Sequence, residues 1–239
     1  MQLYLSSTNS LLSANKGLRW LFIVIGILAL TIVSETLEAL NTQEQRWVDA
    51  VTKTYGSKAG RRVEAWREAL DKYKSLPTEL KLQRVNQFMN QMRWVSDEKL
   101  WGKNDYWATP LEFLGAGAGD CEDYTISKYF SLLEIGIPDS KLRLIYVKAI
   151  TYNQFHMVLA YYESPSSEPL ILDNINPDIE RAGRRKDLLP IYSFNGQNLW
   201  LMKSKNGQLA GDSSRLSLWN DLRDRERSLI LNKPIVSYD

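Results

Sequence analysis

The sequence is poor in the two residue types that most often build zinc clusters and disulfide bridges. Its 239 residues include one cysteine, Cys121, and one histidine, His156. A single thiol cannot form a disulfide within this chain, and one Cys with one His is too few ligands for a structural zinc site. Only one thiol–imidazole pair is therefore possible.

The net charge is also small. Thirty basic and 28 acidic residues leave a net charge of +2, so the overall charge gives no reason to expect a polyanionic partner such as nucleic acid. The hydrophobic fraction of 44% and the charged fraction of 24% are those of an ordinary globular protein. We expect a folded chain with one substantial core or two small lobes, and no nucleic-acid partner.

A run without charged residues lies near the start of the chain. Lys16 and Arg19 precede it, and Glu35 follows it. The run from Trp20 to Val33 is shorter than the ~20 apolar residues that a spanning helix needs, which favours an export signal over a membrane anchor. No clear small-x-small cleavage site follows, so an uncleaved membrane-tethered form and a buried amphipathic helix of a cytosolic protein stay open as alternatives.

Apolar side chains recur at helical spacing in three segments after this leader. The segments are Trp47, Val48, Val51 and Tyr55; Val63, Trp66, Leu70 and Tyr73; and, after Pro77 and Thr78, Leu82, Val85, Phe88, Met89 and Met92. Residues 97–119 break the pattern with Asp105, Pro110 and Gly115-Ala-Gly-Ala-Gly119. We expect a loop there, with glycines that let a substrate backbone come close.

The second half of the chain predicts one central helix followed by strands. We expect a helix from about Cys121 to Ile135, capped by Gly136. Three strands follow, over Leu142–Ile150, Phe155–Tyr162 and Leu170–Asp173. A hairpin over Ile191–Met202 and a charged helix over Leu216–Leu229 complete the pattern. Helices followed by strands indicate an α+β fold, with a helical N-terminal lobe packed on a small antiparallel β-sheet lobe. A cleft between the lobes is the natural place for a site.

This pattern also gives a domain division. We assign residues 1–34 to a signal peptide or N-terminal membrane segment, and residues 35–239 to a single two-lobed domain, with a helical lobe over about 35–135, a β lobe over about 140–205 and a C-terminal segment over 206–239.

Three residues suggest nucleophilic catalysis. Cys121 begins the central helix, where the unpaired amides and the positive end of the helix dipole stabilise a thiolate. His156 follows on a strand, and Asp173 ends the next strand, so a hairpin pairing would let its carboxylate orient the imidazole. Each residue alone is more simply explained as a buried thiol, a core histidine or a turn aspartate. Together they predict Cys121 as nucleophile, His156 as general base and Asp173 as orienting acid.

At this point the sequence resembles the LapG-type bacterial transglutaminase-like cysteine proteases. The resemblance covers most of residues 40–205 and is most specific at Gly119-Asp-Cys-Glu-Asp-Tyr124. Three other segments carry it, namely Tyr106-Trp-Ala-Thr-Pro110, Phe155-His-Met-Val158 and Leu172-Asp-Asn174. The resemblance implies a papain-like or transglutaminase-like fold. It also implies a calcium-dependent periplasmic endopeptidase that cleaves the N-terminal region of a large surface adhesin at a paired-alanine site and disperses biofilm. In this family an inner-membrane receptor for cyclic di-GMP sequesters the protease.

The resemblance maps the calcium ligands onto Asp120 and Glu122, with Asp123 as a further candidate. Adjacent carboxylates disfavour a thiolate at Cys121, and a calcium ion would remove that penalty while taking the oxygen ligands that it prefers. The alternative is that Asp120 caps the helix and Asp123 supports its first turn, which needs no ion.

Two other functions fit the same residues. The triad and fold also serve acyl transfer to an amine, as in transglutaminases, and the sequence does not show which acceptor is used. A non-catalytic peptide-binding module with the same fold is the second alternative, although the complete triad argues against it.

Overall fold

The computed structural model describes residues 40–202 and 207–238. The leader predicted for residues 1–34 lies outside these described residues. Residues from Leu40 onward group into one unit by their internal contacts. Within the described part of the chain, no helix has the length and apolar character required to cross a bilayer.

Three amphipathic helices open the described part of the chain, as the apolar spacing predicted. They are α2 (Thr42–Tyr55), α3 (Ser57–Tyr73) and α4 (Thr78–Met89). Asn41 caps α2, because its side-chain oxygen accepts hydrogen bonds from the amides of Gln43 and Glu44 at 2.9 and 3.0 Å. Gly56, with a φ of 102°, then lets the chain pass directly from α2 into α3.

The segment predicted to be a loop contains two short helices, so that prediction was wrong. They are α5 (Asp97–Leu100) and α6 (Pro110–Ala116), and a short parallel pair joins β1 (Arg93–Trp94) to β2 (Ala118–Gly119). α6 forms despite its glycine because Thr109 and Glu112 make a capping box. The Thr109 hydroxyl accepts from the Glu112 amide at 3.2 Å, and the Glu112 carboxylate accepts from the Thr109 amide at 2.8 Å. Pro110 at the first helical position favours the same start.

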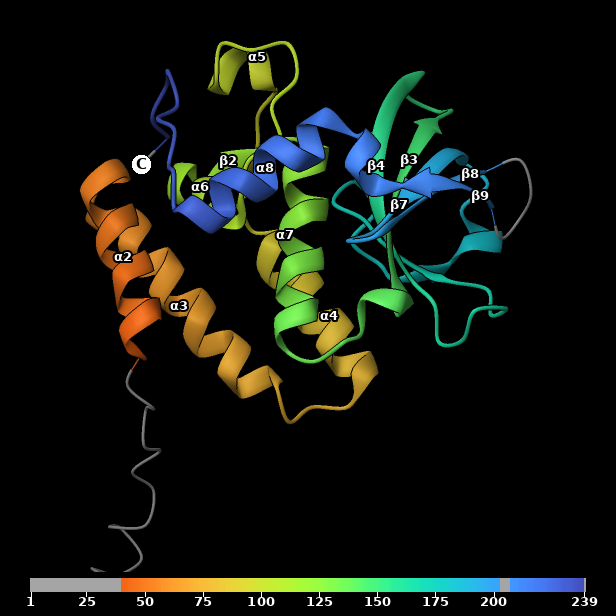
Figure 1. Cartoon of the computed structure of the whole chain (residues 1–239), viewed down its shortest axis with the longest axis horizontal. Helices are drawn as coiled ribbons and strands as arrows, with labels where there is room; N and C mark the ends of the chain where they lie inside the picture. The colour runs from red at the N-terminus through yellow and green to blue at the C-terminus, as the bar shows by residue number, and fades with distance from the viewer. Residues whose placement is uncertain (1–39, 203–206, 239) are drawn as a thin grey trace, which may run out of the picture. The chain divides into compact units, whose positions relative to one another are not determined.

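The central helix α7 runs over Cys121–Glu134, close to its predicted bounds. In Figure 1 it stands between the helices α2 and α3 and the sheet. Ile126 and Tyr129 are buried as expected, whereas Phe130 and Leu133 are half-buried. The helix ends just before Gly136, whose φ of 90° suits glycine.

Within the described residues, the five predicted strands and two that were not predicted, β6 and β9, form one antiparallel sheet in the order β6-β5-β4-β3-β7-β8-β9. Their bounds are β3 (Leu142–Ala149), β4 (Gln154–Tyr161), β5 (Leu170–Leu172), β6 (Glu180–Arg181), β7 (Leu188–Phe194), β8 (Asn198–Leu201) and β9 (Gln208–Asp212). β9 lies beyond the predicted β lobe of about 140–205. Single 3₁₀ turns lie at η1 (Asp139–Lys141), η2 (Ala182–Arg184) and η3 (Ser213–Arg215). The meander of β3, β4 and β5 and the hairpin of β7 and β8 confirm the predicted pairing.

The two faces of the sheet belong to different apolar clusters. Leu144 and Met157 face the helices and join the main core. Ile145 and Val158 lie on the other face, in a smaller cluster. His156 shares the face of Val158 because side chains alternate along a strand.

Hydrogen bonds connect the C-terminal helix α8 (Ser217–Ser228) to the segment that precedes α7. The buried guanidinium of Arg225 contacts the Glu112 carboxylate, and it donates to the Tyr106 hydroxyl at 2.8 Å and to the Trp107 carbonyl at 2.6 Å. Removing one partner of a buried ion pair leaves an uncompensated charge. Arg225 therefore stabilises the residues that lead to the site.

We expect Arg225→Met to lower the free energy of unfolding by about 3 kcal/mol, because Glu112 would keep a buried charge without its partner. Urea denaturation measures the effect. Arg227→Met is the matched control, since Arg227 lies on the same helix with a side chain 64% exposed. Equal stabilities for the two variants would contradict a stabilising role for the buried Arg225–Glu112 ion pair.

Candidate active site and metal centre

His156 and Asp173 form a buried hydrogen-bonded pair. The His156 Nε2 atom lies 2.8 Å from Asp173 Oδ1, and both side chains are 1% exposed or less. A neutral imidazole that donates from Nε2 keeps Nδ1 as a proton acceptor. The pairing predicted from the two strands is thus present, and it fixes the ring orientation that a general base requires.

Arg185 holds the same aspartate from its other oxygen, a contact that sequence reasoning missed. Arg185 Nη2 lies 2.7 Å from Asp173 Oδ2 and 2.8 Å from Asp187 Oδ2. Burial alone would raise the pKa of Asp173, but hydrogen bonds from His156, the Ile175 amide and Arg185 outweigh it and hold that pKa below its usual range. Asp173 therefore stays ionised.

Helix α4 supports the chain segment that carries Asp173. The Asn90 side-chain amide donates to the Asp173 carbonyl at 2.9 Å, and that of Asn86 donates to the Pro177 carbonyl at the same distance. These bonds join residues more than 80 positions apart in the chain. The position of Asp173 thus depends on helix α4 as well as on the sheet.

Cys121 lies at the first position of α7, beside strand β4. One turn later, the Thr125 hydroxyl donates to the Met157 carbonyl at 2.9 Å, which fixes the start of α7 against the residue next to His156. Burial, and then the charges of Glu122 and Asp120, raise the pKa of the Cys121 thiol, while the Met157 amide acts in the opposite direction. The described contacts favour the neutral thiol.

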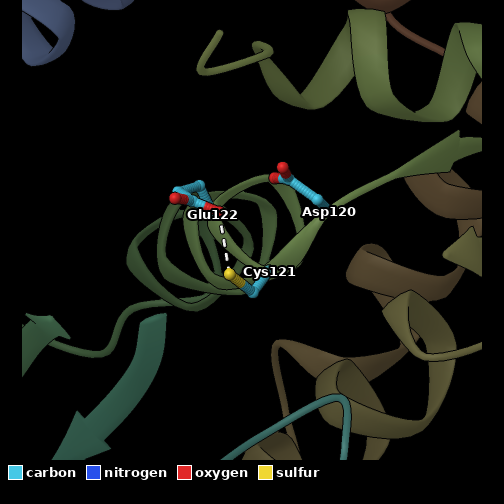
Figure 2. A group of neighbouring side chains, drawn as sticks. All are labelled: Asp120, Cys121 and Glu122. Carbon is cyan, nitrogen blue, oxygen red and sulfur yellow. Dashed lines mark hydrogen bonds between the residues drawn. The ribbon is translucent and has the colours of Figure 1, made fainter. Parts of the chain in front are cut away.

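The thiol is also in contact with an acid. Cys121 Sγ donates to Glu122 Oε2 at 2.8 Å. Figure 2 shows Asp120, Cys121 and Glu122 gathered at the first turn of α7. One potential ligand atom from each of these residues lies within 4.8 Å of the others. Two of the predicted calcium ligands therefore lie beside Cys121.

A second acidic group shares Asp120 and adds a residue that sequence reasoning missed. Carboxylate oxygens of Asp97, Asp120 and Asp123 lie within 4.8 Å of one another. Burial and neighbouring acids raise the pKa of Asp97 to about 7 and that of Asp120 to about 12, and they hold the pKa of Asp123 well above its usual range. Asp97 precedes Cys121 by 24 positions on a different helix, so no local spacing pointed to it.

Asp123 differs from the other two acids because the backbone satisfies both of its oxygens. They accept from the amides of Ala108 at 2.8 Å and Asp120 at 3.2 Å. This matches the alternative in which Asp123 supports the first helical turn. In contrast, Asp97 Oδ1 and Asp120 Oδ1 are buried without a hydrogen-bond partner in the described residues. Two orphaned carboxylate oxygens that face a third acid fit a bound cation.

The glycines before the nucleophile serve packing, which corrects the expectation that they admit a substrate backbone. A Cβ atom on Gly119 would lie 2.4 Å from Asp123 Oδ2 and 2.7 Å from the Phe113 ring. One on Gly115 would lie 2.6 Å from the Tyr55 ring. Other side chains of the protein thus occupy the space beside these glycines.

A helix-terminal thiol, set against a strand that carries a carboxylate-bound imidazole, is typical of cysteine hydrolases with the papain-like or transglutaminase-like fold. The chain matches the family model of bacterial transglutaminase-like cysteine proteinases over residues 59–187. It belongs to that family.

Solved structures of Legionella pneumophila LapG resemble this chain over most of its length. The EGTA-treated form is 40% identical, with a TM-score of 0.68, over 76% of this chain and 96% of that chain. The calcium-bound form is 39% identical, with a TM-score of 0.67, over 77% of this chain and 98% of that chain. A search among curated proteins found no match.

The ion pair between Arg185 and Asp173 leads to a prediction about stability at different pH values. At neutral pH, Arg185→Met should lower the free energy of unfolding by about 3 kcal/mol, because it breaks a buried ion pair. Stability from a depressed aspartate pKa is present above the unfolded value of about 3.9 and is lost as the pH falls through the folded value. The difference between wild type and variant should therefore shrink below about pH 4.

Urea denaturation across this pH range measures the difference. Arg184→Met is the control, since Arg184 is the exposed neighbour of Arg185. A deficit in Arg185→Met that does not change with pH would count against the ionised Asp173–Arg185 pair.

Proposed function

We propose that this protein is a cysteine endopeptidase in which Cys121 is the nucleophile, His156 the general base and Asp173 the orienting acid. The observation that carries the proposal is the buried bond between His156 Nε2 and Asp173 Oδ1. It leaves Nδ1 as the proton acceptor, and the Thr125–Met157 contact places the start of α7 beside this part of β4. Membership of the cysteine proteinase family supports the same roles.

The proposed mechanism uses these three residues. His156 Nδ1 takes the thiol proton as the sulfur attacks the carbonyl carbon of a peptide bond. The carbon–nitrogen bond then breaks, and the imidazolium gives its proton to the departing amine. A water molecule attacks the acyl carbon while His156 accepts its proton. The carbon–sulfur bond then breaks, the carboxylic acid product leaves, and the imidazolium returns the proton to the sulfur. Throughout, Asp173 stabilises the charged imidazolium, and Arg185 holds that carboxylate in place.

The acids beside the nucleophile support a calcium requirement. Asp97, Asp120 and Asp123 offer carboxylate oxygens, and Glu122 lies next to Asp120. A bound calcium ion would supply positive charge that offsets these acids beside the thiol. The calcium-bound structure of the LapG relative supports the same reading.

We also propose the biological setting that the family resemblance suggests. The substrate is the N-terminal region of a large surface adhesin, cut at a paired-alanine site, and its release disperses biofilm. The protease acts in the periplasm, and an inner-membrane receptor for cyclic di-GMP sequesters it. The apolar run between Lys16 and Glu35 supports export.

Cleavage of adhesin N-terminal fragments tests the catalytic roles. Cys121→Ala should be folded and inert, and Asp173→Asn should lower kcat by at least about 100-fold, because the imidazole loses its orienting carboxylate. Asp178→Asn, which alters an exposed aspartate five positions along, is the control. Product masses with and without an added amine distinguish hydrolysis from acyl transfer. Undiminished cleavage by Cys121→Ala would rule out this mechanism.

Calcium binding should stabilise the protein through Asp97. EGTA should abolish cleavage reversibly, and calcium at about 100 times its Kd should add about 2.7 kcal/mol of stability. Asp97→Asn should melt no lower than wild type in EGTA, because it removes a buried charge, and should gain less from calcium. Thermal melts with EGTA or calcium measure both effects. Glu98→Gln, an exposed neighbour, is the control. A full calcium response in Asp97→Asn would exclude Asp97 as a ligand.

A further inference from the structure

A cavity of about 210 Å³ lies beside the nucleophile, on the sheet face that packs against α7. It is lined by Asp105, Trp107, Glu122, Tyr146, Tyr192 and residues 215–218. Glu122 connects the cavity to the reactive sulfur, because its carboxylate contacts Cys121 Sγ at 2.8 Å. A substrate chain bound at Cys121 therefore has this cavity next to it.

Two of the lining residues, Tyr146 and Tyr192, belong to a row of stacked aromatic rings that continues outside the cavity to Phe155. Tyr146 on β3 and Tyr192 on β7 are register partners, and their ring centroids lie 5.1 Å apart at an interplanar angle of 20°. Phe155 on β4 extends the row, with its ring 5.4 Å from that of Tyr146. Phe155 directly precedes His156 and is 57% exposed. The exposed part of this aromatic row is available to a ligand on the sheet face that packs against α7, which is the face opposite to the one that His156 shares with Val158.

The two tyrosines also offer polar groups to a ligand. Neither hydroxyl takes part in a hydrogen bond within the described residues. Burial, and then the charge of Glu122, raise the pKa of Tyr146, so its hydroxyl stays protonated and able to donate. The same holds for Tyr192, whose pKa burial raises to about 12. Flat rings with free donors match the backbone of an extended peptide, which has carbonyl acceptors along its length.

We propose that Tyr146, Tyr192 and Phe155 form the subsite that holds the substrate chain on one side of the scissile bond. The ligand is an extended peptide segment whose backbone lies on the rings and whose carbonyl groups accept from the tyrosine hydroxyls. The volume is below the roughly 300 Å³ at which drug-sized pockets begin, which favours small side chains. This inference rests on the proposed peptidase function and names the residues that select its substrate.

Binding is tested in the Cys121→Ala chain with a blocked, fluorescent decapeptide that contains a central Ala-Ala pair. Tyr146→Phe and Tyr192→Phe should each weaken the Kd about three- to tenfold, the size expected for one lost hydrogen bond. In the chain with Cys121 intact, KM should rise by the same factor with kcat little changed, and iodoacetamide should label Cys121 at the wild-type rate. Tyr73→Phe, at the far end of α3, is the matched control for loss of a hydroxyl.

The outcomes separate this subsite from the peptidase function itself. Cleavage by wild type with an unchanged Kd and KM in both tyrosine variants would overturn the subsite and leave the peptidase standing. Peptide binding that weakens in the variants, without cleavage by wild type, would support the subsite and overturn the peptidase. If no peptide binds to the Cys121→Ala chain, the subsite is refuted.

Discussion

The site depends on two hydrogen bonds that the buried carboxylate of Asp123 accepts from the backbone. The donors are the amides of Ala108 and Asp120, so the carboxylate joins the segment before α6 to the start of α7. Gly119 makes room for this carboxylate, because a Cβ atom there would clash with it. The same residue belongs to the acidic group with Asp97 and Asp120. One side chain thus builds the first turn of α7 and belongs to the acidic group beside it.

The carboxylates of the site are of two physical kinds. Asp173 has a full set of donors, in His156, Arg185 and the Ile175 amide, and its pKa is depressed. Asp173 therefore stays ionised without any further hydrogen-bond donor or cation. Asp97 and Asp120 each have an unpartnered buried oxygen, and their pKa values are raised. The helix-cap explanation of Asp120 does not account for that oxygen, whereas a cation does. The structure thus separates the acid that serves the imidazole from the acids suited to calcium.

Much of the fold could be predicted from the sequence because its signals are local. The apolar spacing along α2, α3 and α4 and the β-branched runs of β3 and β4 each lie within one segment. The helix α6 was missed because three glycines outweighed the capping box at Thr109, although Thr109 and Glu112 stand at the spacing of that motif. Arg185 and Asp97 were missed for another reason. Their partners are brought to them only by folding, and an arginine or an aspartate in a polar segment carries no sign of burial.

The short length of β5 explains how a helix and a sheet can share one site. β5 pairs with β4 only at Leu159–Tyr161, so the ladder stops before Met157. The free edge of β4 at that point is taken by α7, whose Thr125 hydroxyl bonds the Met157 carbonyl. Where β5 ends, the chain turns at Asp173, and the carboxylate reaches back to His156. A longer β5 would continue the ladder along the edge that α7 now occupies. β5, whose end leads to Asp173, therefore stops short of the part of the β4 edge that α7 contacts.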